Sequence, residues 1–206
     1  MRPILHEKHD RICRGAALLT VALAASTVSA GCGAGSAPPG FGEDHGDILI
    51  AATGIGTGQI AIEYDASEAI EVFFNTCIGG TGDDCEGGFV LYSSEEPGFD
   101  ALLENDTEHG LFPLAAGTPV SIELTSNDSG TSFFMNGTSL SSPGDSVVLG
   151  VALEGLHAHG EWQLTLPGGM PPTGEHFIGF RLTTSSQQYA QSVPFGITLT
   201  VGQAAP

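Results

Sequence analysis

The sequence has very few positively charged residues. It contains 5 Lys and Arg against 24 Asp and Glu among 206 residues, a formal net charge of −19. Arg181 is the only Lys or Arg that follows residue 14. A protein of this charge is repelled by the phosphates of nucleic acids and by anionic lipid headgroups, so neither is an expected partner. The acidic excess fits either a solubilising surface or a field that attracts cations.

Long hydrophobic runs are also lacking. The apolar run at residues 16–25 is shorter than the roughly 20 residues that a transmembrane helix needs. Because basic residues precede this run and small residues follow it, residues 1–30 are predicted to be a secretory signal peptide, with Val28-Ser29-Ala30 as a cleavage site. Residues 31–44 are rich in Gly, Ala, Ser and Pro without periodicity, which indicates a flexible tether.

Cysteine is scarce, and its placement indicates export. Cys13 would leave with the signal peptide. Cys77 and Cys85 lie close together in a loop rich in Gly and Asp, so they are predicted to form a disulfide in an oxidising compartment. Cys32 is then odd, and Ser29-Ala30-Gly31-Cys32 resembles a bacterial lipobox in which Ser29 replaces the usual Leu. Lipidation of Cys32 is therefore predicted, giving an outer-membrane, periplasmic or cell-surface lipoprotein; free secretion is the alternative.

Recognisable signatures of catalysis are missing as well. The sequence has no Gly-x-Ser-x-Gly elbow. The glycine-rich stretch at residues 54–58 precedes no helical pattern, so it does not indicate a nucleotide loop. The adjacent carboxylates Glu95 and Glu96 lie in a polar loop and do not by themselves support a glycosidase cleft. The chain is expected not to be an enzyme. One Trp and three Tyr offer few rings for stacking on sugars, which counts against a carbohydrate-binding module.

What the sequence has in plenty is glycine and short alternating apolar runs. With 30 Gly and 41% hydrophobic residues, the chain suits a turn-rich β fold around one core. Residues 97–110 are expected to form an irregular connection with one helical turn. The pattern predicts an all-β chain with a single antiparallel β-sandwich, immunoglobulin-like or jelly-roll-like, over residues 45–206. The expected strands are 47–52, 59–64, 69–74, 89–92, 119–124, 133–135, 145–153, 156–167, 175–184 and 193–201.

Two histidines form the most suggestive chemical pattern. His157 and His159 are two residues apart, so in an extended strand they project from the same face. A pair of imidazoles on one face is a natural start for a zinc or copper site, since both metals take nitrogen ligands. The competing interpretation is that both are polar residues at a strand edge, without a metal. The further candidate ligands are His45, Asp47, His109 and His176.

A second candidate cation site is weaker. Asp83, Asp84 and Glu86 lie in the loop that contains the two paired cysteines. Three carboxylates could hold calcium, but their spacing does not match an EF-hand loop. Calcium is therefore less favoured than zinc or copper. Trp162, the only Trp, is expected in the core.

Several segments resemble a known group of proteins. Leu156-His157-Ala158-His159-Gly160-Glu161-Trp162 is similar to the His-x-His-x-x-Trp signature of bacterial surface-anchored all-β proteins. These include actinobacterial surface-anchored repeat proteins and secreted proteins associated with zinc-responsive regulation and PEP-CTERM sorting. Similar matches are the opening His45-Gly46-Asp47, the mid-domain Pro97-Gly98-Phe99, and the final hairpin with Gly174–Thr183 and Tyr189–Phe195.

The resemblance implies an extracellular β-sandwich with metal affinity and no established enzyme activity. The chain lacks the long His-rich segments of some relatives and a hydrophobic C-terminal sorting tail, so its anchor would be N-terminal. Together, these observations predict a secreted, lipid-anchored, non-enzymatic module that binds a divalent transition metal. The alternatives are a structural or adhesive module without a metal and, third, a carbohydrate-binding module.

Overall fold

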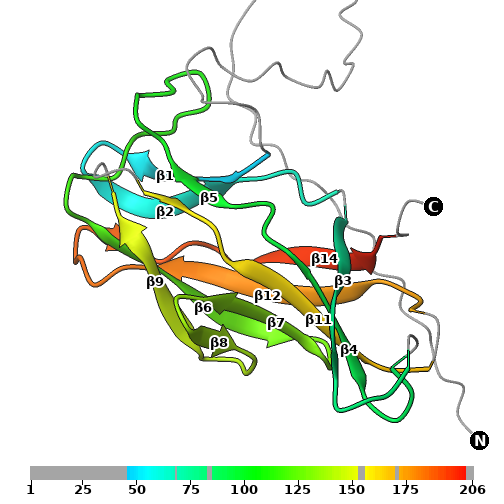
Figure 1. Cartoon of the computed structure of the whole chain (residues 1–206). Helices are drawn as coiled ribbons and strands as arrows, with labels where there is room; N and C mark the ends of the chain where they lie inside the picture. Colours follow the sequence, from blue (N-terminus) through cyan, green and yellow to red (C-terminus); the bar gives the residue numbers. More distant parts are fainter. Residues whose placement is uncertain (1–45, 68, 83–84, 153–155, 170–171, 203–206) are drawn as a thin grey trace, which may run out of the picture. The chain divides into compact units, whose positions relative to one another are not determined.

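The fold was taken from a computed structural model, which describes residues 46–67, 69–82, 85–152, 156–169 and 172–202. These residues form strands, bridges, turns and bends, without any helix among them (Figure 1). The predicted all-β class is confirmed. No helix that could cross a membrane occurs in this part of the chain. The predicted signal peptide, the tether and Cys32 lie outside the described residues.

The described residues contain more and shorter strands than the sequence pattern predicts. The expected helical turn in residues 97–110 is wrong: this segment begins with strand β5, because Phe99 and Ala101 alternate inward on either side of Asp100. The predicted run 156–167 is divided at His159 and Gly160 into two strands. The strands are β1 (Ile48–Gly54), β2 (Thr57–Glu63), β3 (Ile70–Ile78), β4 (Phe89–Ser94), β5 (Phe99–Ala101), β6 (Pro119–Asn127), β7 (Thr131–Met135), β8 (Thr138–Leu140), β9 (Ser146–Val151), β10 (His157–Ala158), β11 (Glu161–Pro167), β12 (His176–Thr183), β13 (Tyr189–Ala190) and β14 (Phe195–Val201).

A five-stranded sheet has the order β10-β5-β1-β2-β13. Its centre is the antiparallel hairpin β1–β2, closed by a tight turn in which Gly56 has a φ of 66°. Strand β5 runs parallel to β1, and the two-residue strand β10 pairs antiparallel with β5. This order brings the chain just before β1 close to β10, although the two segments are far apart in the sequence.

The second sheet has nine strands in the order β8-β7-β11-β4-β3-β14-β12-β6-β9. Its end strands β8 and β9 lie against each other, so the sheet is nearly closed and barrel-like rather than one layer of a clear two-sheet sandwich. The predicted antiparallel arrangement also needs correction, because β14 pairs with β3 in parallel, as β5 does with β1 and β13 with β2. Alternation along a strand indicates which of its faces is buried. It does not indicate which other strand it pairs with, or in which direction, so the sequence pattern did not reveal these parallel pairings.

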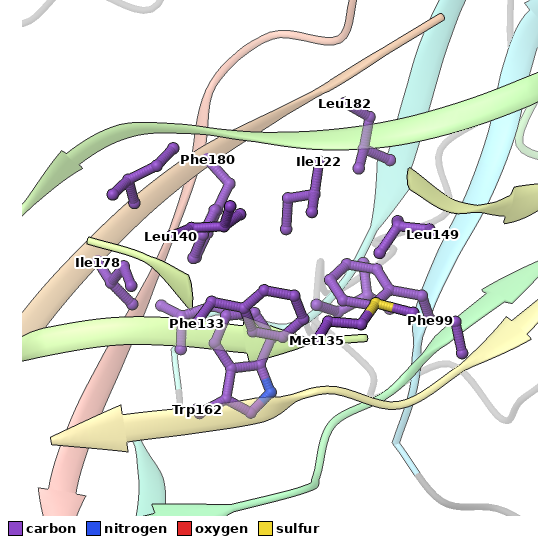
Figure 2. Close-up of a cluster of buried hydrophobic side chains, with 14 of the residues drawn as sticks. Phe99, Ile122, Phe133, Met135, Leu140, Leu149, Trp162, Ile178, Phe180 and Leu182 are labelled. Carbon is purple, nitrogen blue, oxygen red and sulfur yellow. The ribbon is translucent and has the colours of Figure 1, made fainter. Parts of the chain in front are cut away.

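One hydrophobic core receives side chains from both sheets. Strand β6 shows the rule most simply, since Val120, Ile122 and Leu124 alternate inward and are fully buried. An aromatic cluster surrounds Trp162 (Figure 2), whose ring centroid lies 4.6 Å from that of Phe133. Trp162 is completely buried, which confirms its predicted place in the core. The cluster also includes Phe99, Phe133 and Phe180.

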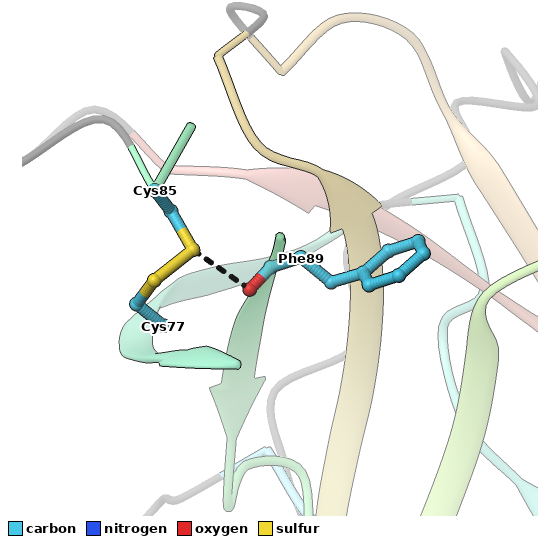
Figure 3. Close-up of a disulfide and its surroundings, with 3 residues drawn as sticks. All are labelled: Cys77, Cys85 and Phe89. Carbon is cyan, nitrogen blue, oxygen red and sulfur yellow. Dashed lines mark hydrogen bonds between the residues drawn. A yellow bond between two sulfur atoms is a disulfide. The ribbon is translucent and has the colours of Figure 1, made fainter. Parts of the chain in front are cut away.

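The predicted disulfide is confirmed. Cys77 at the end of β3 is bonded to Cys85 in the turn that leads to β4, with the two Cα atoms 5.6 Å apart (Figure 3). The Sγ atom of Cys85 also contacts the carbonyl oxygen of Phe89 at 3.1 Å. Asp83 and Asp84 lie outside the described residues, so Glu86 is the only one of the three carboxylates of the less favoured calcium site that the structure describes.

Candidate metal centre

Three of the predicted ligands come together at the edge of the five-stranded sheet. Asp47, His157 and His159 each offer one ligand atom, and these atoms lie within 4.8 Å of one another. We call these residues the Asp–His–His group. Asp47 directly precedes β1, while His157 begins β10 and His159 follows it. The sheet order β10-β5-β1 therefore assembles the group from two distant parts of the chain.

The two imidazole rings face each other through their Nε2 atoms. The Nε2 atoms of His157 and His159 are 3.0 Å apart, and the ring centroids are 4.6 Å apart at an interplanar angle of 72°. In a tetrahedral zinc site with Zn–N bonds of 2.0–2.1 Å, two ligating nitrogens are about 3.3 Å apart. A small rotation of one ring thus brings both Nε2 atoms to the spacing that one metal ion requires.

The Nδ1 atoms on the other side of the rings face oxygen acceptors. His157 Nδ1 lies 3.1 Å from Asp100 Oδ1 and 3.6 Å from Asp47 Oδ2. His159 Nδ1 lies 3.3 Å from the carbonyl oxygen of Glu95 and 3.6 Å from Glu96 Oε1. Outer partners of this kind commonly orient histidines that ligate a metal through the opposite nitrogen.

The segment Pro97-Gly98, which directly precedes β5, contacts two members of the Asp–His–His group. The backbone N–H of Gly98 donates to Asp47 Oδ1 at 2.8 Å, and the indole N–H of Trp162 donates to the Pro97 carbonyl oxygen at 2.8 Å. A Cβ atom on Gly98 would lie 2.6–2.9 Å from three atoms of the His159 ring. Only glycine leaves room for the ring in this position, so Gly98 permits the observed placement of His159.

The surroundings favour a cation. The carboxylates of Asp47, Glu96 and Asp100 lie next to the two imidazoles. The Asp47 side chain is 9% exposed and that of His157 is 53% exposed, so the group has an anchored inner carboxylate and an open outer face. Arg181, the one Lys or Arg after residue 14, forms an ion pair with Glu123 in the other sheet.

The other predicted ligands lie elsewhere or outside the described residues. His45 is not among the described residues. His109 lies on a loop, where its Nδ1 is 2.6 Å from Asp106 Oδ2. This hydrogen bond raises the pKa of His109 and lowers the pKa of Asp106. His176 begins β12 opposite Leu199, with a buried Nε2 that has no hydrogen-bond partner. Among the described residues, neither histidine joins the Asp–His–His group.

Sequence reasoning did not assign three residues to this site. Glu96 was considered only as one of two adjacent carboxylates, Gly98 only as part of a segment that carries the resemblance, and Asp100 only within the expected irregular connection. Asp100 is the direct cross-strand partner of His157, a relation that depends on the pairing of β5 with β10. The available signal was the segment Phe99-Asp100-Ala101, in which a polar residue lies between two apolar ones, as in a strand. Three residues are too few for that alternation to stand out.

Comparisons with protein-family models, with curated proteins and with solved structures find no match to this chain. The functional interpretation therefore depends on the chemistry of the Asp–His–His group in an all-β domain.

Proposed function

We propose that this domain binds a divalent transition metal, zinc or copper, through His157, His159 and Asp47, and that it acts without catalysing a reaction. The observation that carries the proposal is the approach of the two Nε2 atoms to 3.0 Å, together with a carboxylate oxygen of Asp47 that lies within 4.8 Å of a ring nitrogen of each histidine. Two imidazoles and a carboxylate form the donor set of many zinc sites. Calcium and magnesium prefer all-oxygen sites, so the nitrogen pair favours a transition metal.

His45 is proposed as an additional ligand. It lies two residues before Asp47 in the sequence, and a fourth donor would complete a tetrahedral zinc site. With His45 the site would be closed, as structural zinc sites are; with water in its place the metal would keep one exchangeable position. Replacement of His45 by Ala distinguishes the two: loss of a ligand should lower the zinc affinity, whereas affinity equal to that of the wild type would leave the fourth position to water.

The rival proposal is a structural or adhesive module in which the two histidines bind only each other and Asp100. The 53% exposure of His157 is compatible with that interpretation. The two proposals differ in one measurable respect, which is whether the metal-free protein takes up one equivalent of zinc or copper near neutral pH.

Calorimetric titration with zinc and with copper tests the proposal. The wild type is expected to bind one metal ion, and His157→Ala/His159→Ala is expected to bind none while keeping its circular dichroism spectrum. His109→Ala is the matched control, since it removes an exposed histidine outside the group and should bind like the wild type. No uptake by the wild type, or equal uptake by the double variant, would favour the module without a metal.

We also propose that the protein is exported and anchored through a lipid on Cys32. The Cys77–Cys85 disulfide supports an oxidising, extracytoplasmic compartment. Lipidation of Cys32 would account for a cysteine that this pair leaves over. The intact mass of the membrane fraction checks this: the expected species begins at acylated Cys32, and an unmodified species that begins at Gly31 contradicts it.

We also propose a relationship to bacterial surface-anchored all-β proteins. What supports it is that three of the segments that carry the resemblance meet at one place. Asp47 accepts from Gly98, the Gly98 position accommodates the His159 ring, and Trp162 donates to Pro97.

A further inference from the structure

We infer that Asp100 is the positioning residue of this centre, because it fixes which nitrogen of His157 is free to bind metal. The inference depends on the proposed metal function. Asp100 lies in β5 directly opposite His157 in β10, and its Oδ1 atom is 3.1 Å from His157 Nδ1. Side chains that are directly opposite in an antiparallel pair are close enough to interact, so the sheet itself holds this contact in place.

The hydrogen on the His157 ring follows from this contact. A neutral imidazole carries one hydrogen on either nitrogen, and an ionised carboxylate only accepts hydrogen bonds. The short contact with Asp100 therefore keeps the hydrogen on Nδ1 and leaves the lone pair of Nε2 directed at His159. Asp47 is a weaker acceptor for this hydrogen, because its Oδ2 is 3.6 Å from His157 Nδ1 and its Oδ1 already accepts from Gly98.

His159 has a different role. Its Nδ1 faces the neutral carbonyl of Glu95 at 3.3 Å and the Glu96 carboxylate at 3.6 Å, both longer contacts than that between His157 and Asp100. Since Nε2 of His157 carries a lone pair, the 3.0 Å contact between the rings requires His159 to donate its own Nε2–H in the metal-free, neutral state. A metal ion takes the place of that hydrogen. The ring of His159 stays neutral if Nε2 releases a proton to water and Nδ1 takes one from water, after which Nδ1–H donates to Glu95.

Nitrogen NMR of protein labelled with ¹⁵N-histidine tests the assignment at about pH 8, where an ordinary histidine is neutral. In the metal-free wild type, we expect hydrogen on Nδ1 of His157 and on Nε2 of His159. Zinc should convert His159 to the Nδ1–H form and leave His157 in it. Asp100→Asn keeps an acceptor oxygen and should preserve the His157 form, whereas Asp100→Ala should produce a mixture.

Zinc titration of the same variants separates positioning from charge. Loss of an outer partner of a metal-ligating histidine typically weakens metal binding 10–100-fold, so Asp100→Ala should lower zinc affinity by about tenfold or more. Asp100→Asn removes the same charge but keeps an acceptor oxygen, so it should lose less zinc affinity than Asp100→Ala. Glu71→Gln is a control that removes one exposed carboxylate from β3 in the other sheet, and it should bind zinc nearly as the wild type does.

Two results would overturn the inference: hydrogen on Nε2 of His157 in the metal-free wild type, or equal loss of zinc affinity in Asp100→Ala and Glu71→Gln. Failure of the proposed function gives a different result. A wild type that shows the Nδ1–H form of His157 but takes up no zinc removes the metal-binding role of Asp100, while the tautomer assignment stands.

Discussion

Replacement of Gly98 by Ala should separate metal binding from folding. The new Cβ atom would lie 2.6 Å from the nearest His159 ring atom, whereas ordinary contacts begin at 3.4 Å, so the ring must move by about 0.8 Å. Metal–ligand distances tolerate deviations of about 0.2 Å. The displacement is therefore too large for His159 to remain a good ligand in its present position. We expect zinc affinity to fall at least tenfold, which corresponds to about 1.4 kcal/mol.

The same substitution should cost little stability. The His159 side chain is 28% exposed, so the ring can rotate toward solvent instead of compressing the core. Alanine also restricts the unfolded chain more than glycine does, which offsets part of the strain by about 0.4–1 kcal/mol. The free energy of unfolding measured in urea is therefore expected to change by about 1 kcal/mol or less.

Gly202→Ala is the matched control, because its Cβ would lie 2.6 Å from the ring of Phe73, which is itself half-exposed and outside the Asp–His–His group. This control should retain wild-type zinc affinity with a similar small change in stability. The reasoning is refuted if Gly98→Ala binds zinc as tightly as the wild type, or if both glycine variants lose affinity equally.

Three further predictions concern stability and titration. Cys77→Ser/Cys85→Ser opens a crosslink between residues separated by 8 positions, and should lower the free energy of unfolding in urea by about 2.5 kcal/mol on the loop-entropy model; an unchanged midpoint would contradict this. Trp162→Phe removes a buried hydrogen-bond donor and leaves the Pro97 carbonyl group unpaired, so the free energy of unfolding should fall by about 2 kcal/mol or more in urea unfolding followed by circular dichroism. A fall of less than about 0.5 kcal/mol would count against a stabilising role for this hydrogen bond. The pKa of His109 should be above that of a free histidine, and Asp106→Asn should return it to the ordinary range in an NMR pH titration. Because the pKa of His109 is raised and that of Asp106 is lowered, the attraction between the two charged groups should be lost as pH rises through the pKa of His109 and as pH falls through the pKa of Asp106.

Long alternating runs made much of the fold predictable. Strands β6 and β14 have a clear inward and outward pattern over seven to nine residues. Strands β2 and β12 alternate less regularly, and all four lie where the sequence predicts a strand. Strands β5, β8, β10 and β13 have two or three residues, which is too short for a period of two to be recognised. Their existence depends on neighbours that lie far away in the sequence.

The same limit applies to the candidate site. The spacing of His157 and His159 predicted that they project from one face, and in the structure their rings are in contact. Asp47, one of four further candidate ligands, lies close to them. The contribution of Asp100 depends on a partner that is 57 positions away. The need for Gly98 likewise reflects a ring that arrives from another strand. Neither relation leaves a local mark in the chain.

The strand order has a consequence for how this protein can meet other molecules. Three of the four edge strands in the described sheets, β8, β10 and β13, have only two or three residues, and β8 lies against the fourth, β9. Unpaired backbone groups along a sheet edge are the template on which another chain adds as a strand. Three of these four edges offer only two or three residues for such pairing, so among the described strands only β9, with six residues, presents a longer edge. Short edges disfavour growth of the sheets by backbone pairing and leave more of the contact with a neighbour to side chains, in a chain with a formal net charge of −19.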